Sequence, residues 1–210
     1  MRFFAAVLVA ACATDSQAES PDGDRPARIP VSGAGQEVAV FAGGCFWCME
    51  SDFDHLAGVV ATTSGYAGGT IPNPTYAVVS AENSGHQEVV RVVFDTAKLS
   101  YAAVLDYYFH HVDPTDGGGQ FCDRGDSYRP VIFAANAAQA KVANEAKAAL
   151  AGRKVLPGPV VVPVVEGATF YAAEVFHQDY HTINSTRYLS YRTGCRRDAR
   201  VREVWRGEPG

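Results

Sequence analysis

The segment from Gly43 to Glu50, Gly-Gly-Cys-Phe-Trp-Cys-Met-Glu, is the part of the chain best suited to chemistry. An apolar β-type run precedes it and residues at helical spacing follow it, so Cys45 is expected at the start of a helix. The dipole and free amide groups at a helix N-terminus favour a negative sulfur, which predicts a lowered pKa and a nucleophilic Cys45 thiol. Buried structural cysteines are more common overall, but the glycines and aromatic residues around Cys45 favour the reactive interpretation.

Cys45 and Cys48 are three residues apart and therefore share one face of the expected helix. Their backbones would be close enough for the pair to cycle between dithiol and disulfide. The spacing equally fits a thioredoxin-like redox pair or half of a zinc site, although no second pair with zinc-binding spacing occurs. Histidines are scattered through the sequence without clustering, so we expect neither a metal nor a cofactor.

Three further side chains could serve a reactive sulfur. Phe46 and Trp47 either pack in the core or line a pocket, where aromatic rings make favourable contacts with sulfur. Glu88 lies on a β-type run where alternation turns it toward the same face as valines. A carboxylate on an apolar face has a raised pKa and is suited to donate a proton, whereas on an edge strand it would be an ordinary solvated charge.

Composition limits the classes of function. The chain has 210 residues, 47% of them hydrophobic, and a net charge of −5. This length supports one compact domain with a sizeable core. The negative net charge argues against nucleic-acid binding, which needs a basic surface. We see no exposed apolar stripe or heptad pattern and therefore expect a monomer.

The first residues resemble an export signal, with Arg2 followed by an apolar run too short to span a bilayer. Residues 1–18 are assigned to this signal, with two competing processing sites. Val9-Ala10-Ala11-Cys12 resembles a lipobox, which would make Cys12 a lipid anchor, whereas cleavage after Ala18 would discard it. Residues 19–35 are polar and predicted to be a flexible linker. We expect the protein in the periplasm or cell envelope.

Residues 36–210 are predicted to form the folded domain, which ends in an irregular tail. Hydrophobic patterning predicts strands at 37–42, 59–66, 86–95, 128–135 and 159–165, and helices at 45–56, 100–111, 137–152 and 171–184. The loop between 112 and 127 is long, contains three consecutive glycines, and is a candidate binding loop. The order of elements favours an α+β fold, a two-layer sandwich with a ferredoxin-like split βαβ core.

Several separated segments between about Gln36 and Trp205 form a pattern when they are taken together. The segments are Gly43–Glu50, Pro74–Tyr76, Ser84–Val90, His111–Thr115, Gln120–Gly125, Tyr128–Arg129 and Ala173–Tyr180. In content and in order, these segments resemble the A-type peptide methionine sulfoxide reductases.

The resemblance implies a thiol-dependent enzyme that returns methionine S-sulfoxide, free or in proteins, to methionine and so repairs oxidised proteins. It implies that Cys45 attacks the sulfoxide sulfur and becomes a sulfenic acid. The other roles it implies are proton donation by Glu88, hydrogen bonding by the Tyr76 and Tyr128 hydroxyls, a methyl pocket of Phe46 and Trp47, and substrate orientation by Asp123. Thioredoxin or a related dithiol is the implied electron donor.

The sequence does not decide which cysteine resolves the sulfenic acid. Cys48 replaces a glycine that is common in the family, and the tail lacks the family's glycine-rich segment with two cysteines. Cys48 is nearby in sequence, whereas neighbouring arginines would lower the pKa of Cys195. We therefore expect Cys48 or Cys195 to resolve, or both to act in relay, with Cys122 behind both.

Two other functions fit parts of this pattern. A general disulfide oxidoreductase would use Cys45 and Cys48 but would leave Glu88 and the tyrosines without a role. A non-catalytic envelope lipoprotein would use its four remaining cysteines in two structural disulfides. The lipoprotein alternative gives no reason for placing Cys45 beside aromatic residues at the start of a helix.

Overall fold

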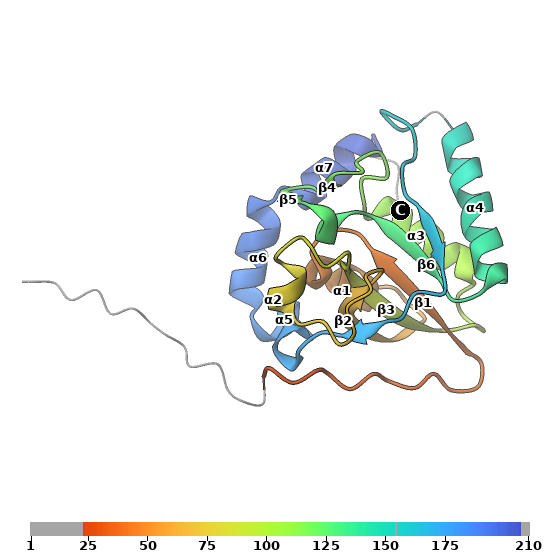
Figure 1. Ribbon diagram of the computed structural model, residues 1–210. Coiled ribbons are helices and arrows are strands. Elements are labelled where there is room, and N and C mark those ends of the chain that lie inside the picture. The colour runs from red at the N-terminus through yellow and green to blue at the C-terminus, as the bar shows by residue number, and fades with distance from the viewer. Residues whose placement is uncertain (1–22, 154, 207–210) are drawn as a thin grey trace, which may run out of the picture.

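The computed structural model describes residues 23–153 and 155–206 (Figure 1). The predicted export signal at 1–18 and Cys12 lie outside these residues. Within the described part, no helix combines the length and the hydropathy needed to cross a membrane. The first strand, β1, begins at Gln36, the predicted start of the folded domain.

A six-stranded sheet in the order β7-β6-β1-β3-β2-β8 forms the centre of the molecule. Its strands are β1 (Gln36–Ala42), β2 (Val59–Ala67), β3 (Gln87–Asp95), β6 (Val131–Ala134), β7 (Val164–Glu166) and β8 (Tyr171–Ala172). β1 and β2 both run antiparallel to β3, which lies between them, and helix α1 (Phe46–Asp54) connects them. β3 and β6 both flank β1 and are connected through α3 (Tyr101–His110). These two interleaved split βαβ units confirm the predicted ferredoxin-like core.

One face of the sheet is covered by helices. Phe41 of β1 stacks on Phe53 of α1 and on Tyr108 of α3, with ring centroids 5.5 and 4.7 Å apart. The core continues to α4 (Ala137–Gly152), which begins and ends where the sequence predicts. On the opposite face, buried Val89 and Phe133 are packed beneath Phe170. The molecule is therefore a two-layer sandwich with loops over its second face, as expected.

The short elements lie in the connections between the main strands and helices. They are α2 (Tyr76–Val79), β4 (Gly119–Gln120), β5 (Asp123–Arg124), a 3₁₀ turn at Asp126–Tyr128, a second 3₁₀ turn at Val175–His177, and α5 (Tyr180–Ile183). β4 and β5 pair within the predicted binding loop.

The predicted irregular tail is wrong, because it forms two helices, α6 (Ser185–Gly194) and α7 (Arg197–Val204). Both helices are largely polar, so hydrophobic periodicity did not reveal them. They are held by a few buried anchors: Tyr188 on α6, Arg197 and Val204 on α7, and Trp205 just beyond. The predicted strand at 159–165 is also too long. Prolines interrupt this segment and cannot donate ladder hydrogen bonds, so pairing begins only at Val164.

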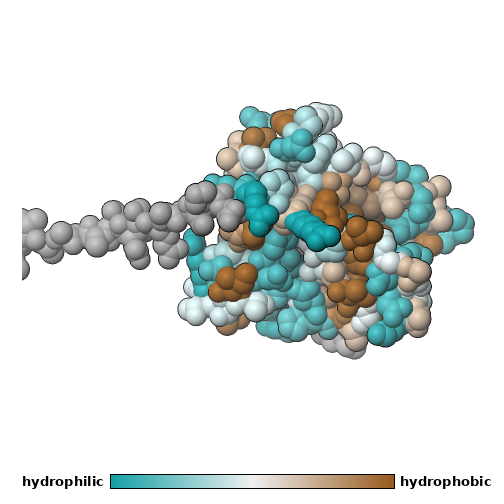
Figure 2. All heavy atoms as spheres, turned by 90° about the horizontal axis from the view of Figure 1, so that it is seen from below, coloured by the Kyte–Doolittle hydropathy of each residue, from teal (hydrophilic) through white to brown (hydrophobic). Residues whose placement is uncertain are grey.

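The described part of the predicted flexible linker runs along the lower edge of the molecule in Figure 1 and is bound to it. Ala27 N donates to Ala173 O, and Val175 N donates to Arg25 O, each at 2.9 Å. Figure 2 views this underside, where hydrophobic and hydrophilic residues are interspersed. The segment also forms one wall of a groove of about 350 Å³ that Phe170 lines from the other side. At least Arg25–Ala27 therefore belongs to the folded domain.

Candidate active site

A tight turn between β1 and α1 positions Cys45. Gly44 adopts φ +82°, and a side chain there would bring its Cβ within 2.8 Å of Gln120 Cβ, so the turn requires glycine. Cys45 is the N-cap residue of α1, as the sequence predicts. Its sulfur is therefore carried by the rigid junction between a central strand and a helix.

Cys45 borders a cavity of about 80 Å³, which suits the end of one side chain. The other lining residues are Phe46, Trp47, Tyr76, Glu88, Asp123, Tyr128 and Tyr191. The structure thus brings together every residue predicted to act in catalysis or substrate binding, although they come from the N-terminus of α1, from α2, β3 and β5, and from the first 3₁₀ turn. Tyr191, on α6 (Ser185–Gly194), also lines the cavity and was not predicted.

Glu88 forms an acidic wall of the cavity. It is only 3% exposed, and its Oε2 accepts a hydrogen bond from the Phe46 amide at 3.0 Å. Burial raises the pKa of the Glu88 carboxyl to about 8 despite that hydrogen bond. The carboxyl group is therefore largely protonated at neutral pH and can donate to an oxygen in the cavity. Because β3 lies inside the sheet, the edge-strand alternative is excluded.

The Cys45 and Cys48 thiols are free, 6% and 2% exposed, and packed in one cluster. Burial raises the pKa of Cys45 well above its ordinary value, and Cys48 and Glu88 raise it further. The prediction of a lowered pKa at Cys45 is wrong for this state, because desolvation outweighs the helix terminus. The pKa of Cys48 is instead lowered, first by a hydrogen bond from Cys45 and then by Arg197 and Arg192.

Phe46 and Trp47 form the aromatic side of the cavity. Trp47 stacks face to face on Tyr180 with centroids 3.7 Å apart, and its Nε1 donates to His177 Nδ1 at 3.1 Å. Phe46 is buried against Tyr66 and His177, with centroid separations of 5.9 and 4.8 Å. Both rings are thus held in fixed orientations where they can pack on a methyl or thioether group.

The two predicted tyrosines are hydroxyl donors next to Glu88. Burial raises the pKa of Tyr76 and of Tyr128, so both remain protonated. Tyr76 is anchored through its backbone, because its amide donates to Glu174 Oε1 at 2.8 Å while Tyr66 Oη donates to Glu174 Oε2 at 2.9 Å. Glu174 therefore sets the position of Tyr76 from outside the cavity.

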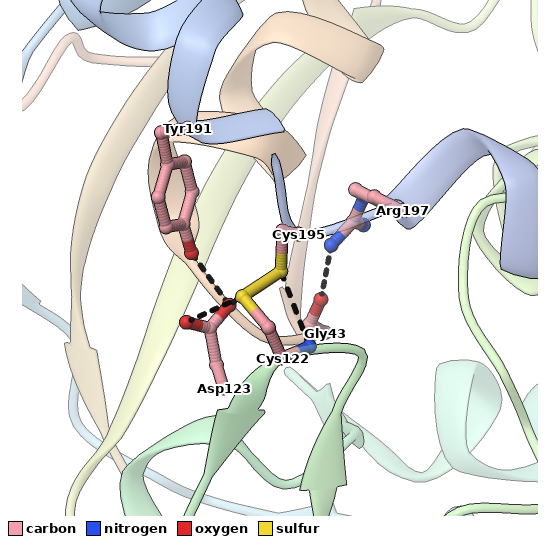
Figure 3. Close-up of a disulfide and its surroundings, with 6 residues drawn as sticks. All are labelled: Gly43, Cys122, Asp123, Tyr191, Cys195 and Arg197. Carbon is pink, nitrogen blue, oxygen red and sulfur yellow. Dashed lines mark hydrogen bonds between the residues drawn. A yellow bond between two sulfur atoms is a disulfide. The ribbon is translucent and has the colours of Figure 1, made fainter. Parts of the chain in front are cut away.

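Cys122 and Cys195 form a disulfide beside the cavity, with Cα atoms 5.0 Å apart (Figure 3). The structure thus gives Cys122 a partner that the sequence analysis did not assign. The Cys122 amide donates to Cys195 Sγ at 3.1 Å. Asp123 follows Cys122 and accepts from Tyr191 Oη at 2.6 Å. Among the described residues this is the sole disulfide, so a protein stapled by two disulfides is not what the structure shows.

Arg197, in the segment predicted to be an irregular tail, is 1% exposed. Its guanidinium donates to Gly43 O at 3.0 Å and to His111 O at 2.9 Å. It also lies over the Phe121 ring, 4.5 Å from the centroid. Arg197 therefore ties the C-terminal helix to the turn that carries Cys45. No local pattern reveals this contact, because the partners are 154 residues apart.

Cys122, Asp123 and Cys195 are the group within the described part that could hold a metal, with ligand atoms within 4.8 Å of one another. Both sulfurs are bonded to each other, so neither is available as a thiolate ligand in this state.

Comparison with known proteins gives a consistent result. The family model for peptide methionine sulfoxide reductase matches residues 37–209. A peptide methionine sulfoxide reductase MsrA 2 of Caulobacter vibrioides is 50% identical over 171 residues, 81% of this chain and 86% of the relative. An MsrA of Bacillus licheniformis is 44% identical over 170 residues, 81% of this chain and 94% of the relative. The reduced form of Mxr1 from Saccharomyces cerevisiae superposes with a TM-score of 0.68 at 27% identity, covering 74% of this chain and 90% of that one.

Proposed function

The chain belongs to the peptide methionine sulfoxide reductase family, and we propose that it reduces the S epimer of methionine sulfoxide, free or in proteins, at Cys45. It is an oxidoreductase whose reaction depends on thiols. The observation that carries the proposal is the cavity in which Cys45, protonated Glu88, two tyrosine hydroxyls and the Phe46–Trp47 wall converge. A disulfide exchanger would need the sulfurs but not the rest of this cavity.

The Cys45 thiolate attacks the sulfoxide sulfur. The oxygen is transferred to Cys45 as a sulfenic acid, methionine leaves as a thioether, and two electrons pass from the Cys45 sulfur to the substrate. Because burial raises the pKa of Cys45, the thiolate has to form as the substrate arrives. A hydrogen bond from Tyr191 lowers the pKa of Cys45 and supports that step.

Glu88, Tyr76 and Tyr128 stabilise the oxygen. The protonated carboxyl of Glu88 transfers its proton as negative charge develops on the sulfoxide oxygen. The two phenols hold the oxygen by hydrogen bonds. When the sulfoxide oxygen lies against Glu88 and the two tyrosines, Phe46 and Trp47 hold the methyl group. Asp123 orients the substrate. A chiral sulfur can satisfy all of these contacts in one configuration only, which is the basis for epimer selectivity.

Cys48 resolves the sulfenic acid in this proposal. Its thiolate attacks the Cys45 sulfur, a disulfide forms, and the oxygen leaves as water. Both sulfurs lie in the same buried cluster, and the pKa of Cys48 is lowered, which favours its nucleophilic form. Cys195, the other predicted resolving residue, is bonded to Cys122 instead. The electron donor that completes the cycle is thioredoxin or a related dithiol protein.

Reduction of separated S and R epimers of a methionine sulfoxide peptide with dithiothreitol tests the proposal. We expect turnover of the S epimer alone, and none with Cys45→Ser. Turnover of the R epimer by the same site, or turnover of neither epimer, would overturn the proposal, and the second result would favour disulfide exchange.

The proposed location is the periplasm or cell envelope, with the protein monomeric and either free or anchored through lipid on Cys12. The basic and apolar residues at the start of the chain and the lipobox-like run before Cys12 support this. Mass spectrometry of the mature N-terminus decides between the two processing sites. An unprocessed Met1 in the cell would contradict export.

A further inference from the structure

The two pairs of cysteines differ in exposure. Cys45 and Cys48 are 6% and 2% exposed, whereas Cys122 is exposed and Cys195 is partly exposed. Thiol–disulfide exchange requires the attacking sulfur to reach the disulfide directly. The thiol end of a small dithiol can enter the Cys45 cavity of about 80 Å³, but a folded donor protein cannot bring its sulfur to a Cys45–Cys48 disulfide in this conformation.

We propose that the Cys122–Cys195 disulfide is the point at which a protein dithiol donor delivers electrons, which Cys195 then passes to the Cys45–Cys48 pair. This inference rests on the proposed function and gives Cys122, a loop residue, a redox role. The state described here, with Cys122–Cys195 oxidised and Cys45 and Cys48 free, is the one expected after electrons have moved inward and before the donor acts.

A separate cleft gives the donor access. It has a volume of about 390 Å³, is lined by both Cys122 and Cys195, and shares no lining residue with the Cys45 cavity. Phe121 supplies an apolar surface, while the charged lining residues are Asp113, Asp116, Arg196, Arg200 and Glu203. This surface suits the segment around a reactive cysteine of a folded donor, because it offers both an apolar contact and charged groups.

The local contacts assign different roles to the two sulfurs. Cys122 is the more exposed and is the sulfur that the donor attacks. Cys195 is the better leaving group, because its sulfur already accepts the Cys122 amide hydrogen bond at 3.1 Å and its chain neighbours include arginines. Reduction therefore starts with a donor–Cys122 mixed disulfide and a Cys195 thiolate.

Asp123 separates this disulfide from the cavity. Its carboxylate oxygens lie 3.6 Å from Cys122 Sγ and 3.9 Å from Cys195 Sγ, and the same side chain lines the Cys45 cavity. Once the Cys122–Cys195 disulfide is reduced, the end of α6 is no longer covalently bound to the loop that carries Cys122. Cys195 lies at the junction of α6 and α7 and can then move past Asp123 toward the buried pair.

The electrons balance over three steps. Sulfoxide reduction and resolution leave a Cys45–Cys48 disulfide and water. The Cys195 thiolate attacks that disulfide, and Cys122 then attacks the resulting mixed disulfide, so Cys45 and Cys48 regain their thiols and Cys122–Cys195 becomes oxidised. The donor dithiol attacks Cys122, its second thiol displaces Cys122, and the donor leaves as a disulfide.

The test compares two reductants on the variant Cys122→Ser/Cys195→Ser. We expect the ratio of thioredoxin-driven to dithiothreitol-driven S-sulfoxide turnover to fall about tenfold or more relative to the wild type, because the buried pair is reachable only by the small dithiol. An unchanged ratio would overturn the inference. Failure of the wild type to reduce sulfoxide with dithiothreitol would instead overturn the proposed function, so the two failures are distinguishable.

A trapping experiment on the wild-type protein keeps the inference testable if the double variant does not fold. Oxidised protein is mixed with thioredoxin whose second active-site cysteine is replaced by serine, and the mixed disulfide is mapped by mass spectrometry. Attachment at Cys122 supports the inference, whereas attachment at Cys45 or Cys48 contradicts it.

Discussion

The indole nitrogen of Trp47 lies 3.1 Å from Nδ1 of His177, joining the first helix to a 3₁₀ turn 130 residues later. Burial lowers the pKa of His177 to about 4, so the ring is neutral at physiological pH and its Nδ1 can accept the hydrogen bond. Tyr180 stacks on the face of the same indole. Trp47 is therefore held by its edge and by one face.

His177→Leu should weaken substrate binding by removing the acceptor, while His177→Asn, whose amide oxygen can take the place of Nδ1, should restore much of it. We expect KM for the S-sulfoxide to rise about tenfold in the leucine variant, corresponding to the loss of one buried hydrogen bond, with a smaller change in kcat. Steady-state kinetics on both variants provides the check. Equal KM values for the two would show that His177 acts only by filling space.

Glu88→Gln should change the pH dependence of stability. The folded pKa of Glu88 is about 8 and its ordinary value is 4.5, so the native carboxyl holds a proton that the unfolded chain releases between these values. Its contribution to stability is fully present below pH 4.5 and is lost as the pH rises through 8. Glutamine does not titrate, so the stability of the variant relative to wild type should increase across this window by a few kcal/mol.

Urea unfolding of both proteins at several pH values measures this difference. Glu50 is also buried with a pKa raised to about 8, but it is present in both proteins and cancels. A difference that does not vary with pH would mean that Glu88 ionises normally in the fold.

Cys48→Ala should make Cys45 easier to ionise but unable to recycle. The hydrogen bond and charge of Cys48 both raise the pKa of Cys45, so their removal lowers it. The rate of Cys45 alkylation by iodoacetamide should reach half its maximum at a lower pH than in the wild type, while thioredoxin-driven turnover falls. Mass spectrometry of the alkylated peptide gives the rate at each pH. Cys48→Ser is the matched control that retains a hydroxyl. A midpoint at higher pH would contradict the coupling.

The elements with strong periodicity were predictable from sequence because local pattern alone determines them. Helix α4 keeps its predicted bounds, and β3 turns Glu88 to a buried face as alternation indicates. The polar helices α6 and α7 lack a clear apolar stripe, and their stability depends on a few anchors such as Arg197 and Trp205. Their formation depends on tertiary contacts that no local window contains.

The same distinction applies to the site. The residue types around Cys45 were recognisable, but the direction of its pKa shift was not, because desolvation depends on how completely the fold covers the sulfur. The partnership of Cys122 with Cys195 spans 73 residues. Likewise, Tyr191 reaches the cavity only because α6 docks against the loop that carries Asp123.

Arg197→Met should destabilise the fold through the junction that carries Cys45. The Arg197 side chain is 2% exposed and forms an ion pair with Asp52 at 3.4 Å, in addition to its hydrogen bonds to the Gly43 and His111 carbonyl groups. Methionine keeps the bulk but leaves those buried acceptors without this donor. Removing one partner of a buried ion pair typically costs about 3–5 kcal/mol, and Arg192, 2.8 Å from Asp52, should moderate the loss.

The adjacent Arg196 supplies a matched control. Its side chain is 75% exposed and only 3.7 Å from Glu203 at its closest, and exposed ion pairs contribute about 0–1 kcal/mol. Urea unfolding should therefore show a large loss for Arg197→Met and almost none for Arg196→Met. The pKa of Cys48 should also rise in the first variant alone, because Arg197 lowers it. Equal stability of the two variants would mean that α7 is held by Val204 and Trp205, and that the guanidinium merely occupies the space beneath the Cys45 turn.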